Sequence, residues 1–88
     1  MLHQTGLSRR LLPLRNALEG AGVPLSVGYE QIRRQVFPTP IKDGRRSLVP
    51  SDEVEAVIAA RIAGRTEPEI RALVQRLLAL RQTGADPV

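Results

Sequence analysis

The sequence predicts a mainly α-helical domain with a small β-hairpin, in the form of a winged helix-turn-helix followed by an extra C-terminal helix. Two helical patterns separated by a short corner come first, and an Asp-Gly dipeptide between two extended runs follows them. Two further amphipathic patterns complete the chain. The chain has 88 residues, of which 42% are hydrophobic, so it can form one domain with one modest core.

The first two helices are expected on either side of a tight corner at Val23-Pro24. Pro13 suits the first turn of a helix, apolar residues follow at helical spacing, and glycines at positions 20 and 22 end the pattern. The second helix is expected from about Leu25 to Gln35. Its core-facing residues are predicted to be Val27, Ile32 and Val36, with Tyr29 at the edge. Gly28 is a poor helix former, which indicates a close approach of this helix to the first helix or to a binding partner.

The segment after the second helix predicts a hairpin. Prolines at positions 38 and 40 stop the helix after Phe37. The dipeptide Asp43-Gly44 then separates two short extended runs, which is a strong signal for a hairpin with a type I′ turn. The cationic residues near its tip are Lys42, Arg45 and Arg46.

Two more helices are predicted after the hairpin. Ser51 is the expected N-cap of the third, with acidic residues in its first turn, and Gly64 ends it. Its apolar stripe consists of Val54, Val57, Ile58 and Ile62. A capping box at Thr66–Glu69 opens the fourth helix, which runs to about Gln82. The apolar stripe of the fourth helix consists of Ile70, Leu73, Val74, Leu77 and Leu78.

These patterns divide the chain into four segments. Residues 1–11 are expected to form a flexible basic arm that ends in Arg9 and Arg10, and residues 12–64 to form the winged domain. Residues 65–82 form the C-terminal amphipathic helix and residues 83–88 a disordered tail. A lone helix of this length is marginal in water, so its apolar stripe must pack either on its own core or on a neighbouring protomer. We expect the contact between protomers.

Charge is distributed unevenly along the chain. The net charge is +4, but residues 1–50 contribute +5 (eight basic against three acidic residues) and residues 51–88 contribute −1 (five against six). Because the excess positive charge lies in the half that carries the first two helices and the hairpin, a polyanion is the expected partner of that half.

The composition offers little for catalysis or for a cofactor. The chain has no cysteine, its only histidine is His3, and it has no glycine-rich phosphate loop, so we expect neither an enzyme nor a metal site. Two aromatic residues are too few for single-strand stacking platforms. With no apolar run of membrane length and no signal peptide, the sequence predicts a cytoplasmic bacterial protein, associated with the nucleoid.

Three segments resemble one family of small DNA-binding proteins. LPLRNALEGAGV at 12–23, GVPLSVGYEQIRRQVFPTPIK at 22–42 and DGRRSLVPSDEVEAVIAARI at 43–62 are similar to AlpA-like phage regulators and small excisionases. These are MerR-like winged helix-turn-helix proteins, and the resemblance covers about 50 of the 88 residues. FPTPIK together with SDEVEAVIAARI is its most specific part. The fourth helix lies beyond the usual family pattern.

The resemblance implies binding of double-stranded DNA, with the second helix in the major groove and the hairpin as a wing on the backbone. The expected recognition-helix contacts are Ser26, Tyr29, Glu30, Arg33 and Arg34. The expected wing contacts are Lys42, Arg45 and Arg46, and Arg9 and Arg10 are candidates in the arm. On the fourth helix, the expected contacts between protomers on DNA are Ile70, Leu73, Val74, Leu77 and Leu78.

Three functions remain open at this stage. The first is an excisionase that binds and bends attachment-site DNA cooperatively and directs an integrase towards excision of a mobile element or prophage. The second is an AlpA-like transcriptional regulator of such an element. The third, from another class, is a protein-interaction module such as an antitoxin or adaptor.

Overall fold

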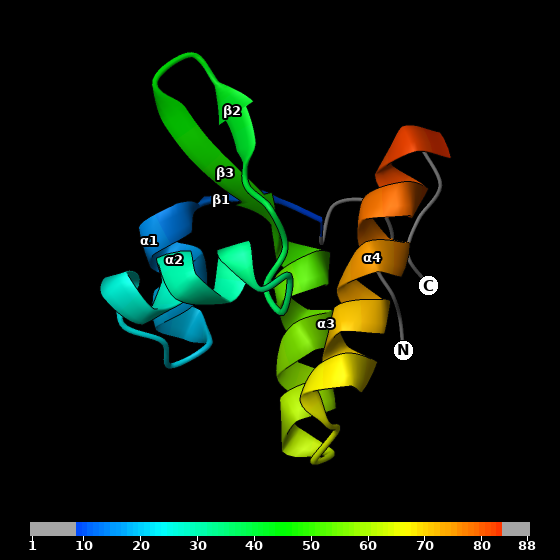
Figure 1. Cartoon of the computed structure of the whole chain (residues 1–88). Coiled ribbons are helices and arrows are strands. Elements are labelled where there is room, and N and C mark those ends of the chain that lie inside the picture. The colour runs from blue at the N-terminus through cyan, green and yellow to red at the C-terminus, as the bar shows by residue number, and fades with distance from the viewer. Residues whose placement is uncertain (1–8, 84–88) are drawn as a thin grey trace, which may run out of the picture.

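The computed structural model describes residues 9–83 and has the predicted order of two short helices, a hairpin and two longer helices (Figure 1). The elements are β1 (Leu11–Pro13), α1 (Leu14–Gly20), α2 (Leu25–Arg33), β2 (Ile41–Asp43), β3 (Arg46–Pro50), α3 (Ser51–Ile62) and α4 (Glu67–Thr83). Helices α1 and α2 with the β2–β3 wing form a winged helix-turn-helix, and α4 is the additional C-terminal helix. Thr83, expected in the tail, is the last residue of α4; residues 84–88 lie outside the described part.

Strand β1 is an element that the sequence analysis did not predict. It pairs antiparallel with β3, in the register Leu11 with Pro50 and Pro13 with Leu48, and the sheet order is β1-β3-β2. The expected flexible arm therefore ends earlier than residue 11, and residues 1–8 lie outside the described part. Three residues are too few to show an alternating pattern, so pairing with β3 decides this strand.

Ser51 serves this pairing instead of capping α3. Its hydroxyl oxygen accepts a hydrogen bond from the backbone N–H of Arg10 at 2.8 Å, and its own N–H donates to the Arg10 carbonyl at 2.6 Å. Pro50 occupies the N-cap position and no side chain caps the helix. The expected N-cap at Ser51 was wrong because the hydroxyl has a tertiary partner.

The hairpin turn also differs from the expected type. Asp43 pairs with Arg46, so the two central turn residues are Gly44 and Arg45. Of these two residues, Gly44 alone has a positive φ, at 63°. A type I′ turn needs positive φ at both central positions, whereas glycine alone at the first position is the pattern of a type II′ turn.

The core lies where α1, β3, α3 and α4 meet the loop after α2. Phe37 and Leu18 are the largest of its fully buried side chains. The buried cluster consists of Leu14, Ala17, Leu18, Val36, Phe37, Val49, Val54, Val57, Ile70, Val74 and Leu77. Val27 and Ile62, predicted to face the core, are instead 45% and 82% exposed. Periodicity places them on an apolar face, but α2 and α3 bury narrower faces than their stripes suggest.

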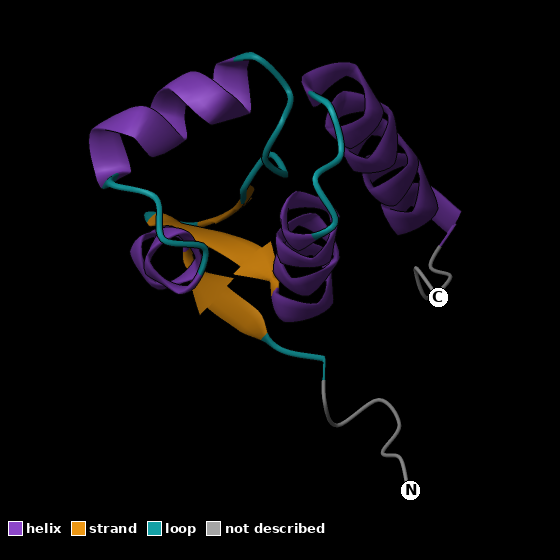
Figure 2. Cartoon of the chain, turned by 90° about the horizontal axis from the view of Figure 1, so that it is seen from below, coloured by secondary structure: helices purple, strands orange, loops and turns teal. Residues whose placement is uncertain are grey.

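Helix α4 packs on its own chain. It lies beside α3 in both views (Figures 1 and 2), and Ile70, Val74 and Leu77 are buried in the common core. Leu73 and Leu78 pack partly buried against this core. The expected contact between protomers through this stripe is therefore corrected. Because the turn between α3 and α4 is short, bringing the two helices together within the chain costs little conformational entropy.

The start of α4 follows the prediction closely. The Glu69 carboxylate accepts from the Thr66 N–H at 2.9 Å, and the Thr66 hydroxyl accepts from the Glu69 N–H at 3.4 Å. This reciprocal pair is the predicted capping box.

A buried ion pair joins the far end of α4 to the start of α3. Glu53 is only 1% exposed, and Arg81 donates to its two oxygens at 2.9 and 2.6 Å. A buried carboxylate needs such a partner, since an uncompensated charge in the interior is strongly destabilising. From the sequence, Glu53 is only one of the acidic residues in the first turn of this helix, because its partner lies 28 residues away along the chain.

Gly28 allows α2 to lie directly on α1. It is a buried residue of α2, and a Cβ atom built there would stand 2.3 Å from Cδ1 of Leu18. Leu18 is itself 1% exposed, so its side chain has little room to move away. Figure 2 shows α1 end-on beneath the length of α2. The close approach expected at this glycine is therefore made to the first helix.

We expect Gly28→Ala to destabilise the fold although alanine is the better helix former. The gain in helix propensity is about 1 kcal/mol, while overpacking a close contact costs typically about 1–3 kcal/mol. Gly20→Ala is the matched control, because a Cβ at Gly20 meets nothing within 4 Å. Urea unfolding of both variants measures the difference. A more stable Gly28→Ala variant would show that α1 and α2 are not in tight contact.

Candidate nucleic-acid interface

The outer face of α2 carries the side chains predicted to contact DNA. Ser26, Tyr29, Glu30 and Arg33 are all exposed and share this face through their spacing of three and four residues. Tyr29, expected at the edge of the core, is 58% exposed and stands fully on this face. Helix α2 therefore presents a row of polar side chains, and an α-helix is an element that a major groove can admit.

Arg33 is paired on this face with Glu30. Its guanidinium donates to a Glu30 carboxylate oxygen one turn earlier in the helix. Both side chains are largely exposed, at 72% and 46%. Exposed pairs of this kind contribute little to stability, so Arg33 can exchange Glu30 for another acceptor at small cost.

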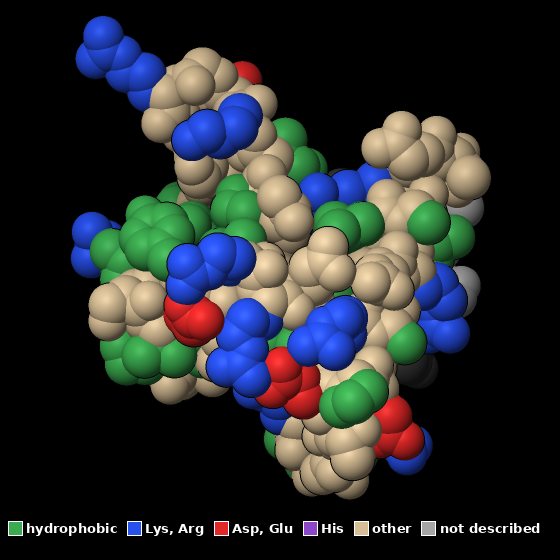
Figure 3. Space-filling model, viewed as in Figure 1, with side chains coloured by type: hydrophobic (Ala, Val, Ile, Leu, Met, Phe, Trp, Pro, Cys, Tyr) green, Lys and Arg blue, Asp and Glu red, His purple; other side chains and the backbone are tan. Residues whose placement is uncertain are grey.

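The wing brings three cations to its tip. Lys42 donates to the Ser47 hydroxyl at 3.0 Å across the hairpin, and Arg46 pairs with Asp43 at 3.2 Å. Arg45 lies in the turn and makes no ion pair or side-chain hydrogen bond within residues 9–83. Lys and Arg side chains recur on one face, from the wing tip across α2 to its junction with α4 (Figure 3).

A shallow hollow connects the wing with α2. Tyr29 and Ile32 line it from the helix, and Lys42 and Ser47 line it from the hairpin. The two elements therefore form one continuous surface on which helix and wing can contact the same ligand.

Arg34 does not share the outward position of Arg33. Its Nε atom donates to Oε2 of Glu67 at 3.2 Å, and a second nitrogen donates to the other carboxylate oxygen. Arg71 also donates to Glu67, at 2.9 Å, and to the backbone carbonyl of Arg34, at 3.0 Å. Arg34 is therefore held by α4, in contrast to its expected place among the DNA contacts.

This ion-pair cluster shifts two pKa values. The hydrogen bond from Arg34 holds the pKa of Glu67 below its ordinary value, and the charges of Arg34 and Arg71 act in the same direction. The same hydrogen bond raises the pKa of Arg34.

Further bonds fix the end of α2. Arg61 of α3 donates to the side chain of Gln31 at 2.9 Å and to the Val36 carbonyl at 3.2 Å. Gln75 of α4 donates to the side chain of Gln35, which ends the helix with a φ of 65°. Four of the residues that hold α2 were not predicted from the sequence: Arg61, Glu67, Arg71 and Gln75. Their only sequence signal is the spacing of four residues that places 67, 71 and 75 on one face of α4.

The two arm candidates lie at the start of α3. Arg9 pairs with Asp52 at 3.0 Å, and the backbone of Arg10 bonds to Ser51. The structure thus does not join Arg9 and Arg10 to the surface made by α2 and the wing.

The fold and this surface define the class: a winged helix-turn-helix protein whose helix and wing share one cationic face. Comparison with protein-family models, curated proteins and solved structures found no match to this chain. Within residues 9–83 there is no cluster of three or more potential metal ligands. No helix in the described part of the chain is long and apolar enough to cross a bilayer.

We expect Glu67→Gln to lower stability at neutral pH and to matter less in acid. Because the folded state holds the pKa of Glu67 down, its carboxylate stabilises the fold above the ordinary Glu pKa of about 4.3. This contribution disappears as the pH falls through the lower folded-state pKa. Thermal unfolding of both proteins from pH 7 to pH 2.5 measures the narrowing difference.

The control for this prediction is the same substitution in an Arg34→Ala background. Without its main partner, Glu67→Gln should have a smaller effect at pH 7. An equal effect in both backgrounds would show that Glu67 stabilises the fold independently of Arg34.

Proposed function

We propose that this protein binds double-stranded DNA, with α2 in the major groove and the wing on the neighbouring backbone. The observation that carries the proposal is the single exposed face shared by the polar side of α2 and the cationic wing. Helix α1 packs across α2 at Gly28, as the first helix of such a pair does when it fixes the angle of the second.

The residues divide into two roles in this proposal. Ser26, Tyr29, Glu30 and Arg33 face the base edges or the groove walls, because they occupy the outer side of α2. Lys42, Arg45 and Arg46 contact phosphates, since a hairpin tip carries charge but no rigid row of side chains. Arg34 is assigned to holding α2, since Glu67 and Arg71 engage its side chain and carbonyl.

The resemblance to AlpA-like regulators and small excisionases narrows the proposed role to the control of a mobile element. The protein would direct an integrase towards excision at attachment-site DNA or would activate transcription of excision genes. The buried stripe of α4 removes one route to cooperative binding, so any cooperation between protomers uses another surface. Footprinting around the gene and a nearby attachment site distinguishes the roles: repeated protected sites support the excisionase, and a single protected promoter supports the regulator.

We expect Arg33→Ala to weaken binding and to relax the preference at one base position. A good base-edge contact contributes about 1–3 kcal/mol of discrimination. Binding of Arg33→Ala to duplexes that vary at each position measures this. Arg76→Ala, on the far side of α4, is the control and should bind like the unaltered protein. Equal loss on all duplexes would make Arg33 a phosphate contact.

Arg45→Ala combined with Arg46→Ala should weaken binding to every duplex alike. If both arginines contact phosphates, the slope of log affinity against log salt becomes shallower by roughly 1 to 2 units. Fluorescence anisotropy with a labelled duplex from low to physiological salt provides the slope. An unchanged slope would exclude the wing from the interface, and no salt-dependent binding by the parent protein would overturn the proposed function itself.

A further inference from the structure

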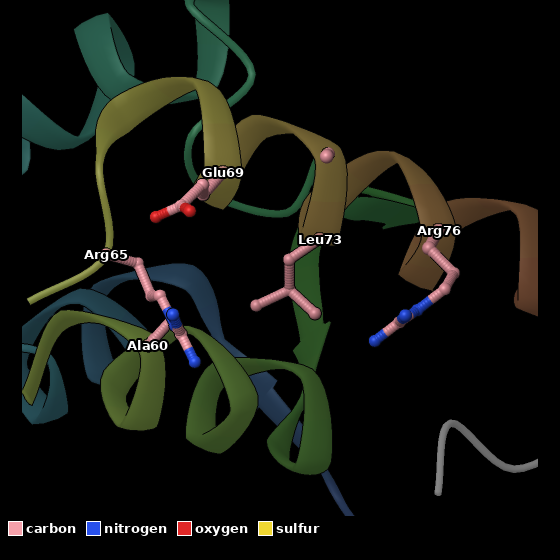
Figure 4. A pocket seen from close by; sticks show the side chains of 6 residues that line it. Ala60, Arg65, Glu69, Leu73 and Arg76 are labelled. Carbon is pink, nitrogen blue, oxygen red and sulfur yellow. The ribbon is translucent and has the colours of Figure 1, made fainter. Parts of the chain in front are cut away.

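A second surface lies between α3 and α4, on a different face of α4 from the one that bonds to α2. Ala60 lines it from α3, Arg65 lines it from the turn, and Glu69, Ala72, Leu73 and Arg76 line it from α4. We call this surface the α3–α4 groove. Figure 4 shows the Leu73 side chain pointing between the two helices, with Arg65 towards one end and Arg76 towards the other.

The shape of the groove follows from side-chain size. Ala60 and Ala72 leave space that larger residues would fill, and Leu73 is only partly buried between them. The floor is therefore apolar and still accessible. Such a floor is suited to one or two inserted aliphatic side chains.

The charges at the ends of the groove are available. Of the five arginines from 61 to 81, Arg61, Arg71 and Arg81 donate hydrogen bonds to other residues of the fold. Arg65 and Arg76 make no ion pair or side-chain hydrogen bond with any residue from 9 to 83. Glu69, the one acid of the groove, is engaged by the Thr66 N–H in the capping box, and Arg65 attracts it only from a distance.

We propose that the α3–α4 groove is a docking site for an acidic amphipathic helix of another protein. Its apolar side chains would lie on Leu73 and the two alanines, and its carboxylates would pair with Arg65 and Arg76. Charge complementarity selects this occupant: two available guanidinium groups flank an apolar floor, so the groove fits a segment with the opposite charges on both sides of an apolar stripe.

Two other occupants fit less well. A DNA backbone would gain nothing from the apolar floor, because its phosphates and sugars offer no aliphatic side chain to insert there. A second copy of the chain, placed groove to groove by a two-fold axis, would bring arginines against arginines, and these like charges repel. The site does not depend on the proposed DNA binding, because α4 uses residues 67, 71 and 75 towards α2 and residues 69, 72, 73 and 76 towards the groove.

The test uses the whole chain and a synthetic helical peptide with Leu at i, i+3, i+4 and i+7 and Glu on both flanks. We expect saturable shifts of the amide NMR signals of Ala60, Ala72 and Leu73. A control peptide with Lys in place of each Glu should give none. No saturable binding, or shifts confined to α2 and the wing, would overturn the proposal.

Charge reversal by Arg65→Glu with Arg76→Glu should weaken peptide binding at least tenfold. The matched control, Arg45→Glu with Arg46→Glu, has the same net charge but leaves the groove intact and should retain the peptide. Ala72→Gln fills the hollow without a change of charge, and it should also reduce peptide binding. This variant keeps the test decisive if the charge-reversed variant does not fold.

Two further measurements on the variant with Arg65→Glu and Arg76→Glu test whether the groove binds a second copy of the chain or DNA instead. Sedimentation reveals whether it dissociates a dimer, and duplex binding reveals whether it loses DNA. Either result would overturn the docking proposal. Retained duplex binding together with lost peptide binding supports it and leaves the DNA interface standing independently.

Discussion

The contact between Gly28 and Leu18 is the constraint on which the rest of the surface depends. Helix α2 has nine residues, and Gly28 is its only fully buried one. Leu25 and Ile32 pack only partly buried against the core, so the close contact of the α2 backbone with α1 adds to what holds this short helix. Because no Cβ separates the two helices, α2 lies low on α1 and can present its whole polar side to a ligand.

Helix α4 supplies the second restraint and shows how one amphipathic helix can serve several purposes. Ile70, Val74 and Leu77 complete the core, and residues 67, 71 and 75 reach the end of α2. At its C-terminal end, Arg81 neutralises the buried Glu53 of α3. The exposed face of α2 is therefore supported from both sides, by α1 beneath α2 and by α4 at its C-terminal end. Helix α4 therefore has a structural role within a single protomer.

The arginines illustrate why charge counted along a chain differs from charge available to a ligand. Arg33 and Arg34 are neighbours in sequence, yet Arg33 stands on the outer face while Arg34 is held by Glu67. In the second half, where acids outnumber bases, Arg65 and Arg76 still make no ion pair within residues 9–83. Arg45 on the wing and Arg65 and Arg76 beside the α3–α4 groove are therefore available to a ligand on two separate surfaces.

The sequence by itself determined the order of the four helices and the hairpin, and it determined the capping box of α4. These features rest on local signals: periodicity, proline and glycine placement, and side chains that bond within one turn. It also identified Ser26, Glu30 and Arg33 as outward residues of α2 and located the cations of the wing. Only the tertiary structure decided strand β1, the turn type, the role of Ser51, the pairs Glu53–Arg81 and Arg34–Glu67, and the packing of α4 on its own chain. Each of these features depends on contacts between segments that are distant in the sequence. An apolar stripe or a single charged residue indicates that a partner is required, but it does not specify which residue that partner is.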